Sequence, residues 1–138
     1  MPGRKRYDAL SQAVGAVQLP TFVAKDGEFI VDPSYTDDAW RTLQAEAGDI
    51  EDKAKSLQDH PHLHDSHKAL ADDLVTAATS FDGMVTTAHD EWLALPKGYD
   101  VKQTESMVGL GNVLQFMRGK LGEFDQGKLD AVTAAFGS

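Results

Sequence analysis

The sequence has no cysteine. This excludes disulfide frameworks, thiolate zinc sites, iron–sulfur clusters and cysteine nucleophiles, so the fold has to be stable without disulfides. A chain of 138 residues is long enough for that, because a domain of this size buries about two-thirds of its unfolded surface. We predict one domain that spans residues 1–138.

Long hydrophobic runs are also missing. No apolar stretch approaches the roughly 18 residues that a transmembrane helix requires. The stretch YDALSQAVGAVQLP carries Asp8 and Gln12 where a signal peptide has an uninterrupted apolar core. We therefore expect no membrane span and a cytoplasmic location.

Basic residues are scarce, with 13 Lys and Arg against 22 Asp and Glu, which gives a net charge of −9. Three of them, Arg4, Lys5 and Arg6, fall within residues 1–6, which we expect to form a flexible basic terminus. The remaining ten basic and 22 acidic side chains would repel a phosphate backbone. The folded body is therefore not expected to bind nucleic acid directly.

Near residues 21–32 the sequence predicts a short β-hairpin. Asp26 and Gly27 can both adopt the positive φ that a type I′ turn requires, and the resulting register pairs Lys25 with Glu28. Because an isolated hairpin is marginally stable in water, we expect its apolar face to pack on helices. That face consists of Phe22, Ala24, Phe29 and Val31.

Most of the remaining sequence has the spacing of amphipathic helices. Apolar residues recur every three or four positions in five segments: residues 7–17, 36–58, 62–95, 103–121 and 127–136. The two clearest stripes are Trp40, Leu43, Ala47, Ile50, Ala54 and Leu57, and then Ala71, Leu74, Ala78, Phe81, Val85, Ala88, Trp92 and Leu95. Pro96 and Gly98 should end the second of these helices.

These segments predict a mainly α fold, an antiparallel helical bundle of four to five helices with one short β-hairpin near residues 21–32. The connection between the helices 36–58 and 62–95 is short, which favours an antiparallel pair. The helix 62–95 is the longer of the two, so we expect its Trp92 end to hold the hairpin and the N-terminal helix.

Four of the five histidines lie in the stretch DHPHLHDSH, residues 59–67. If Pro61 is the first helical residue, the core stripe extends backwards to His67 and His64. His60 then precedes the helix and His62 faces solvent. Two imidazoles at i and i+3, a third close by and an aspartate could bind zinc, nickel or copper. The candidate metal ligands are His60, His64, His67 and Asp65.

A polar turn at the wet end of the bundle is the alternative for the same stretch. Histidines in such a turn would be partly desolvated on folding, and the stability of the fold would then depend on pH. The chain has no His-Glu-x-x-His motif and no cysteine, so no recognised zinc spacing is present. No cofactor is therefore expected, with zinc or nickel as the alternative.

Sequence motifs for catalysis are missing. The chain has no Glu-x-x-His pair for a di-iron bundle and no nucleophile elbow. Gly109, Gly111 and Gly119 do not have the spacing of a phosphate loop, and we expect them to serve close helix packing. We predict no catalytic residue.

These patterns favour a non-enzymatic acidic helical bundle that acts through protein–protein interaction or assembly, with a partner protein or a second copy of the chain. Two alternatives remain open. One is a divalent-metal-binding or pH-responsive module built on residues 59–67. The other is an acidic decoy that binds a nucleic-acid-binding protein.

Overall fold

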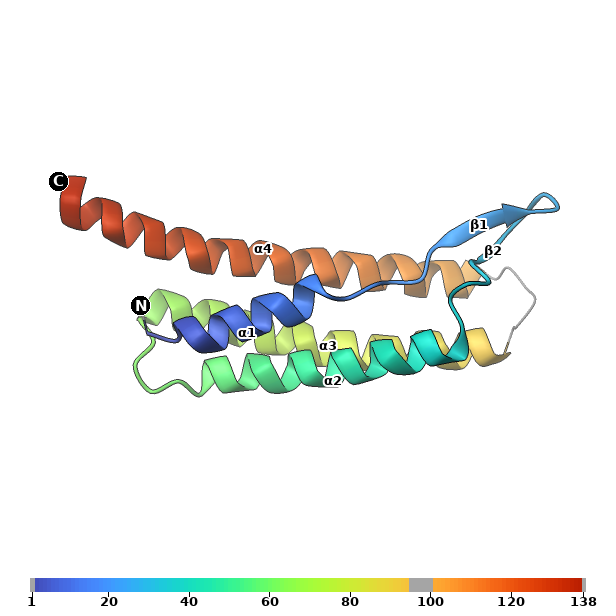
Figure 1. Ribbon diagram of the computed structural model, residues 1–138, viewed down its shortest axis with the longest axis horizontal. Coiled ribbons are helices and arrows are strands. Elements are labelled where there is room, and N and C mark those ends of the chain that lie inside the picture. Colours follow the sequence, from blue (N-terminus) through green and yellow to red (C-terminus); the bar gives the residue numbers. More distant parts are fainter. Residues whose placement is uncertain (1, 95–100, 138) are drawn as a thin grey trace.

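The computed structural model describes residues 2–94 and 101–137 (Figure 1). In chain order the elements are α1 (Arg4–Gly15), β1 (Phe22–Lys25), β2 (Glu28–Val31), α2 (Asp37–Gln58), α3 (Asp65–Ala94) and α4 (Val101–Gly137). Helix α2 packs on α3, α3 packs on α4, and α1 packs on α2 and reaches α4. The predicted fold class, a mainly α helical bundle with one short hairpin, is confirmed.

The predicted apolar stripes form the core. Every residue of the α2 stripe from Trp40 to Leu57 is buried, and so is the α3 stripe from Ala71 to Ala88. Trp92 is partly buried against the same core. The spacing of three and four residues explains this result, because it keeps one side of each helix toward its neighbour. Leu95 and the expected stop at Pro96 and Gly98 lie outside the described residues.

Helix α1 begins earlier and packs elsewhere than the sequence predicts. Residues 4–6, expected to belong to a flexible terminus, form its first turn. Arg4 pairs with Asp8 one turn along, and the Arg6 guanidinium donates a 2.7 Å hydrogen bond to the Ser56 carbonyl oxygen of α2. These contacts place α1 at the histidine end of the bundle, so the Trp92 end holds the hairpin but not the N-terminal helix.

The hairpin has the predicted register, with Lys25 opposite Glu28 and Phe22 opposite Val31. Asp26 and Gly27 have φ angles of 53° and 82°, as a type I′ turn requires. Val31 is buried, and Phe22 is partly buried against the core. The hairpin is therefore anchored where it joins the helices, while its turn projects from them (Figure 1).

Replacing Gly27 with valine should lower the melting temperature by roughly 5 °C. A β-branched side chain at a φ of 82° is strained by about 1–2 kcal/mol. Thermal unfolding followed by circular dichroism measures the change. The control is Gly27→Asn, since asparagine tolerates this region and should leave the melting temperature nearly unchanged. Equal melting temperatures for Gly27→Val and the wild type would contradict the turn.

Two helix boundaries differ from the prediction. Helix α3 begins at Asp65 rather than near Pro61, because Pro61 lies in a turn and the first helical bond runs from the Lys68 amide to the His64 carbonyl oxygen. Helix α4 is continuous, whereas the sequence predicted separate helices over 103–121 and 127–136. Phe124 explains the continuity, since it prolongs the apolar stripe and is fully buried. The burial of Leu129, Val132 and Phe136 lies outside what the structure describes.

Close helix packing accounts for one of the glycines of α4. A Cβ atom at Gly109 would approach the Met84 Cε atom of α3 to 2.6 Å. At Gly111 and Gly119 a Cβ atom would meet no neighbouring atom within 4 Å. The expectation of close packing is therefore confirmed at Gly109 and wrong at Gly111 and Gly119.

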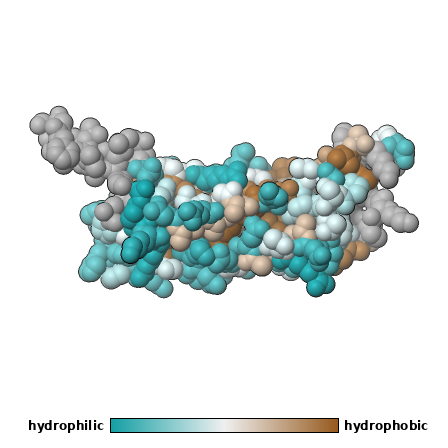
Figure 2. All heavy atoms as spheres, in the orientation of Figure 1, coloured by the Kyte–Doolittle hydropathy of each residue, from teal (hydrophilic) through white to brown (hydrophobic). Residues whose placement is uncertain are grey.

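Charge is concentrated on the side of the bundle that carries α2. Of the eight exposed residues of α2, five are charged: Asp38, Arg41, Asp49, Asp52 and Lys55. Figure 2 shows this side, with α1 and α2 at the front, as a largely hydrophilic surface. Within residues 2–94 and 101–137, no helix is both long enough and apolar enough to cross a membrane.

Candidate functional site

The predicted metal ligands are spread over the turn between α2 and α3. His60 lies in the turn, and its Nδ1 atom accepts a 3.1 Å hydrogen bond from the His62 amide. His64 and Asp65 are exposed at the start of α3, whereas the His67 side chain is buried in its first turn. Among the described residues, no three His, Asp or Glu side chains come close enough together to hold a metal ion.

Zinc should therefore leave the melting temperature unchanged within about 1 °C, since a ligand stabilises a fold only by binding its native state. The measurement is thermal unfolding with excess zinc and with a chelator. A sharp zinc-dependent rise that disappears in the double variant His64→Leu, His67→Leu would instead establish the metal-binding alternative.

His67 has a partly apolar environment made by two other helices. Its ring stacks on Phe124 of α4, with centroids 3.9 Å apart, and Phe124 also stacks on Tyr7 of α1 at 4.9 Å. Burial lowers the pKa of His67, and the nearby His64 lowers it further, while a hydrogen bond with the Phe124 backbone opposes the shift. The Nδ1 atom of His67 is buried and has no hydrogen-bond partner among the described residues.

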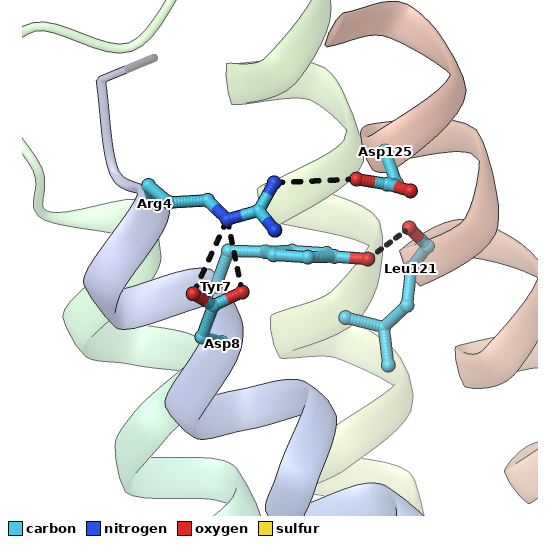
Figure 3. A network of polar contacts seen from close by, with 5 residues as sticks. All are labelled: Arg4, Tyr7, Asp8, Leu121 and Asp125. Atoms are coloured by element: carbon cyan, nitrogen blue, oxygen red, sulfur yellow. Dashed lines mark hydrogen bonds and ion pairs between the residues drawn. The ribbon is translucent and has the colours of Figure 1, made fainter. Parts of the chain in front are cut away.

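Polar contacts hold the same end of the bundle together (Figure 3). The Tyr7 hydroxyl donates a 3.0 Å hydrogen bond to the Leu121 carbonyl oxygen, and Arg4 reaches Asp125 at 3.4 Å. Burial, and then the Asp125 carboxylate, raise the pKa of Tyr7. These contacts connect α1 with α4 just before α4 extends beyond the other helices.

At the opposite end lies a buried histidine that the sequence did not single out. The His89 Nε2 atom is 2.7 Å from Asp37 Oδ1, and its ring stacks on Trp40 with centroids 5.5 Å apart. Trp92 lies on the same cluster, 6.1 Å from His89 between ring centroids. The hydrogen bond with His89 lowers the pKa of Asp37.

An acid–histidine pair of this kind also occurs in catalytic sites, and here its histidine is part of the packed core. His89 is only 7% exposed and packs against two tryptophan rings. The second carboxylate oxygen of Asp37 forms an ion pair with Arg41, whose Nε atom lies 2.8 Å away. The pair therefore joins the start of α2 to the end of α3.

The outer surfaces of α3 and α4 are free of exposed charge over residues 76–87 and 106–117. We call this surface the neutral face. Its exposed residues are Thr76, Thr79, Ser80, Gly83, Thr86 and Thr87 of α3, and Val108, Asn112, Gln115 and Phe116 of α4. No exposed position of residues 76–87 or 106–117 carries a charge, whereas charged residues border both ends. This is the reverse of α2, where five of eight exposed residues are charged.

A shallow groove of about 470 Å³ runs along the neutral face between α3 and α4. Its lining is mostly small or hydroxyl-bearing: Thr79, Ser80, Gly83, Met84, Thr87 and Ser106. The Ser106 hydroxyl, which belongs to the lining, donates a 2.8 Å hydrogen bond to Glu91 of α3. The sequence of residues 76–87 contains a single charged residue, Asp82. Only the packing of α3 on α4 shows that the uncharged surfaces of these two helices lie side by side.

Comparison with known protein families, with characterised proteins and with solved structures finds no match for this chain. Its function therefore has to be inferred from its own residues and their geometry.

Proposed function

We propose that the chain is a non-enzymatic interaction protein that binds a helix of a different protein along the neutral face. The observation that carries this proposal is the absence of charge from all ten exposed residues of that face, in a protein with 35 charged side chains. The centres of protein interfaces are depleted of charged residues, whereas an ordinary exposed helix surface is rich in them.

The shape of the neutral face suits a helix. Gly83 has no side chain, and Ser80 and Thr87 on either side of it are small, so the backbone of a partner helix could approach α3 closely. Phe116 is 49% exposed, and Lys120 Nζ lies 5.3 Å from the centre of its ring. A half-exposed aromatic residue beside a groove is the type of side chain that anchors an interface.

Charge at the borders indicates the chemistry of the partner. Asp72 and Asp73 lie at one end of the neutral face, and Asp90 and Glu91 lie at the other. Two cations of α4 lie beside the first pair, the exposed Arg118 and Lys120, which is paired with Asp73 at 3.4 Å. The acidic border is therefore strongest at the other end, where Glu105 of α4 is also exposed. The expected partner is an amphipathic helix with an uncharged stripe and basic residues beside it. A second copy of this chain would bring acidic borders together, so it fits less well.

Photo-crosslinking in the cells that make the protein tests this proposal. A benzophenone side chain replaces Phe116 on the neutral face, and the matched control replaces Thr42 on the charged surface of α2. We expect position 116 to capture one protein through a helix with flanking basic residues, identified by sequencing the cross-linked peptide. Position 42 should not capture it.

Each other outcome has a definite meaning. A nucleic-acid-binding protein captured at position 42, and nothing specific at 116, would overturn the proposal in favour of the acidic decoy. A cross-link between two copies of the chain at position 116 would replace the partner helix with self-association. The same set of proteins at both positions would also contradict a specific neutral-face interaction.

A further inference from the structure

Three rings from three helices meet at the histidine end of the bundle, and we call this group the aromatic joint. It consists of Tyr7 of α1, Phe124 of α4 and His67 of α3. The Phe124 ring is nearly parallel to both of the others, with interplanar angles of 8° to Tyr7 and 19° to His67. Phe124 is fully buried, so its packing depends on the two rings that it stacks on.

The aromatic joint fastens α4 to the bundle at the place where α4 leaves it. The Tyr7 hydroxyl bonds to the Leu121 carbonyl oxygen, and Arg4 pairs with Asp125, so both polar contacts are within four residues of Phe124 (Figure 3). Beyond this point α4 continues to Gly137 and extends past the other helices (Figure 1). Loosening Phe124 would therefore detach the packed end of α4 from α1 and α3.

His67 is the one member of the joint whose charge can change near neutral pH. Its side chain is 3% exposed, and its Nδ1 atom has no hydrogen-bond partner in the part of the chain that the structure describes. A second proton on the ring would place a positive charge in this site and leave a buried N–H group without an acceptor, which is costly.

The Phe124 backbone hydrogen bond and the stacked Phe124 ring favour an imidazolium, but the surrounding charges do little to accommodate it. The His64 ring is 5.8 Å away and would repel it when protonated. Of the carboxylates that the other helices bring to this end, Asp8 and Asp125 are both paired with Arg4. The other described titratable or charged groups at this end include Arg6 of α1, Asp59 at the end of α2, His60 and His62 of the turn, Asp65 and Lys68 of α3, and Glu123 of α4. All of these are exposed except His60, which is partly buried.

We propose that His67 makes the aromatic joint an acid-sensitive latch, in which protonation separates His67 from Phe124 and frees the end of α4 from α1. The buried stripe of α4 at Met117, Leu121 and Phe124 would then become accessible. The latch is independent of the neutral face, because it involves neither the groove nor its lining residues.

The linkage between proton binding and folding determines how the stability of the latch changes with pH. The pKa of His67 is lower in the folded protein than in the unfolded chain, so the unfolded chain binds more protons in acid. The stabilisation is present above the unfolded value of about 6.5 and is lost as the pH falls below it. The latch should therefore be closed at pH 7.5 and loosened near pH 5.5.

Hydrogen exchange measured by mass spectrometry at these two pH values tests the latch. After correction for the intrinsic exchange rate, protection of peptides covering residues 4–10 and 118–126 should fall at pH 5.5, by at most about tenfold. Peptides from the middle of α2 should change much less. The His67→Leu variant should lose the difference between the two pH values, and the matched control His62→Leu, at an exposed position, should keep it.

Two results would overturn the latch: equal protection of residues 118–126 at both pH values in the wild type, or an undiminished pH difference in His67→Leu. If His67→Leu fails to fold, His67→Gln supplies a smaller, non-titrating replacement. An NMR titration of the wild-type histidine Cε1 protons needs no variant. It should give a midpoint for His67 below the unfolded value of about 6.5, and a midpoint at or above that value would also contradict the proposal.

Discussion

Phe81→Ala should lower the free energy of unfolding by about 3–5 kcal/mol, because Phe81 is fully buried in the middle of α3 and its truncation leaves a cavity between α3 and its neighbours. Urea denaturation followed by circular dichroism measures the loss. The matched control is Phe116→Ala, since Phe116 is half-exposed on α4 and its truncation should cost less than about 1 kcal/mol. Similar losses for the two phenylalanines would show that the α3 stripe is not the core of the bundle.

His89→Ala should lower the free energy of unfolding by about 2–4 kcal/mol. The variant removes the bond to Asp37, the stacking on Trp40 and the contact with Trp92 at once. His62→Ala is the control, because His62 is exposed and its loss should cost close to nothing. Equal effects of the two substitutions would contradict the structural role assigned to His89.

The pH dependence of the free energy of unfolding should reveal the contact between Asp37 and His89. The bond with His89 lowers the pKa of Asp37 in the folded protein, so this stabilisation is present above the unfolded value of about 4 and is lost as the pH falls toward the folded value. The His89→Ala variant should therefore lose less stability than the wild type as the pH falls below about 4. Parallel pH profiles would show that Asp37 gains nothing from His89.

Local chemistry explains which parts of the fold could be predicted. The hairpin follows from Asp26 and Gly27, whose turn type fixes the register of both strands. The stripes of α2 and α3 follow from apolar spacing, which depends on helix geometry alone. Both signals lie within a few residues along the chain, so no knowledge of the tertiary structure is needed to interpret them.

Contacts between distant residues explain what could not be predicted. His89 follows the stripe residue Ala88 directly, but its partner Asp37 is 52 positions away and belongs to another helix. The start of α3 was placed too early because a proline suits a first helical turn, whereas here Pro61 lies in a turn in which the His60 ring accepts the His62 amide. Both features depend on the packed structure rather than on local preference.

In the candidate site too, some features follow from the local sequence and others only from contacts between distant residues. The histidine stretch was conspicuous in the sequence because of its composition, yet only His67 became buried, and it did so against residues of α1 and α4. The neutral face was the reverse case. Its α3 part is rich in threonine and serine, which the sequence analysis did not single out, and its meaning depends on how α4 lies beside it.

The most direct test of the neutral face compares two glycines. A side chain at Gly83 or at Gly48 would meet no neighbouring atom at its Cβ, so arginine at either position should leave the fold intact. Gly83 lies in the groove, whereas Gly48 lies on α2. For the protein captured at position 116, isothermal titration calorimetry should show binding weakened by about 30-fold or more in Gly83→Arg. In Gly48→Arg the affinity should stay within about twofold of the wild type. Unchanged binding by Gly83→Arg, or equal losses in the two variants, would contradict the account.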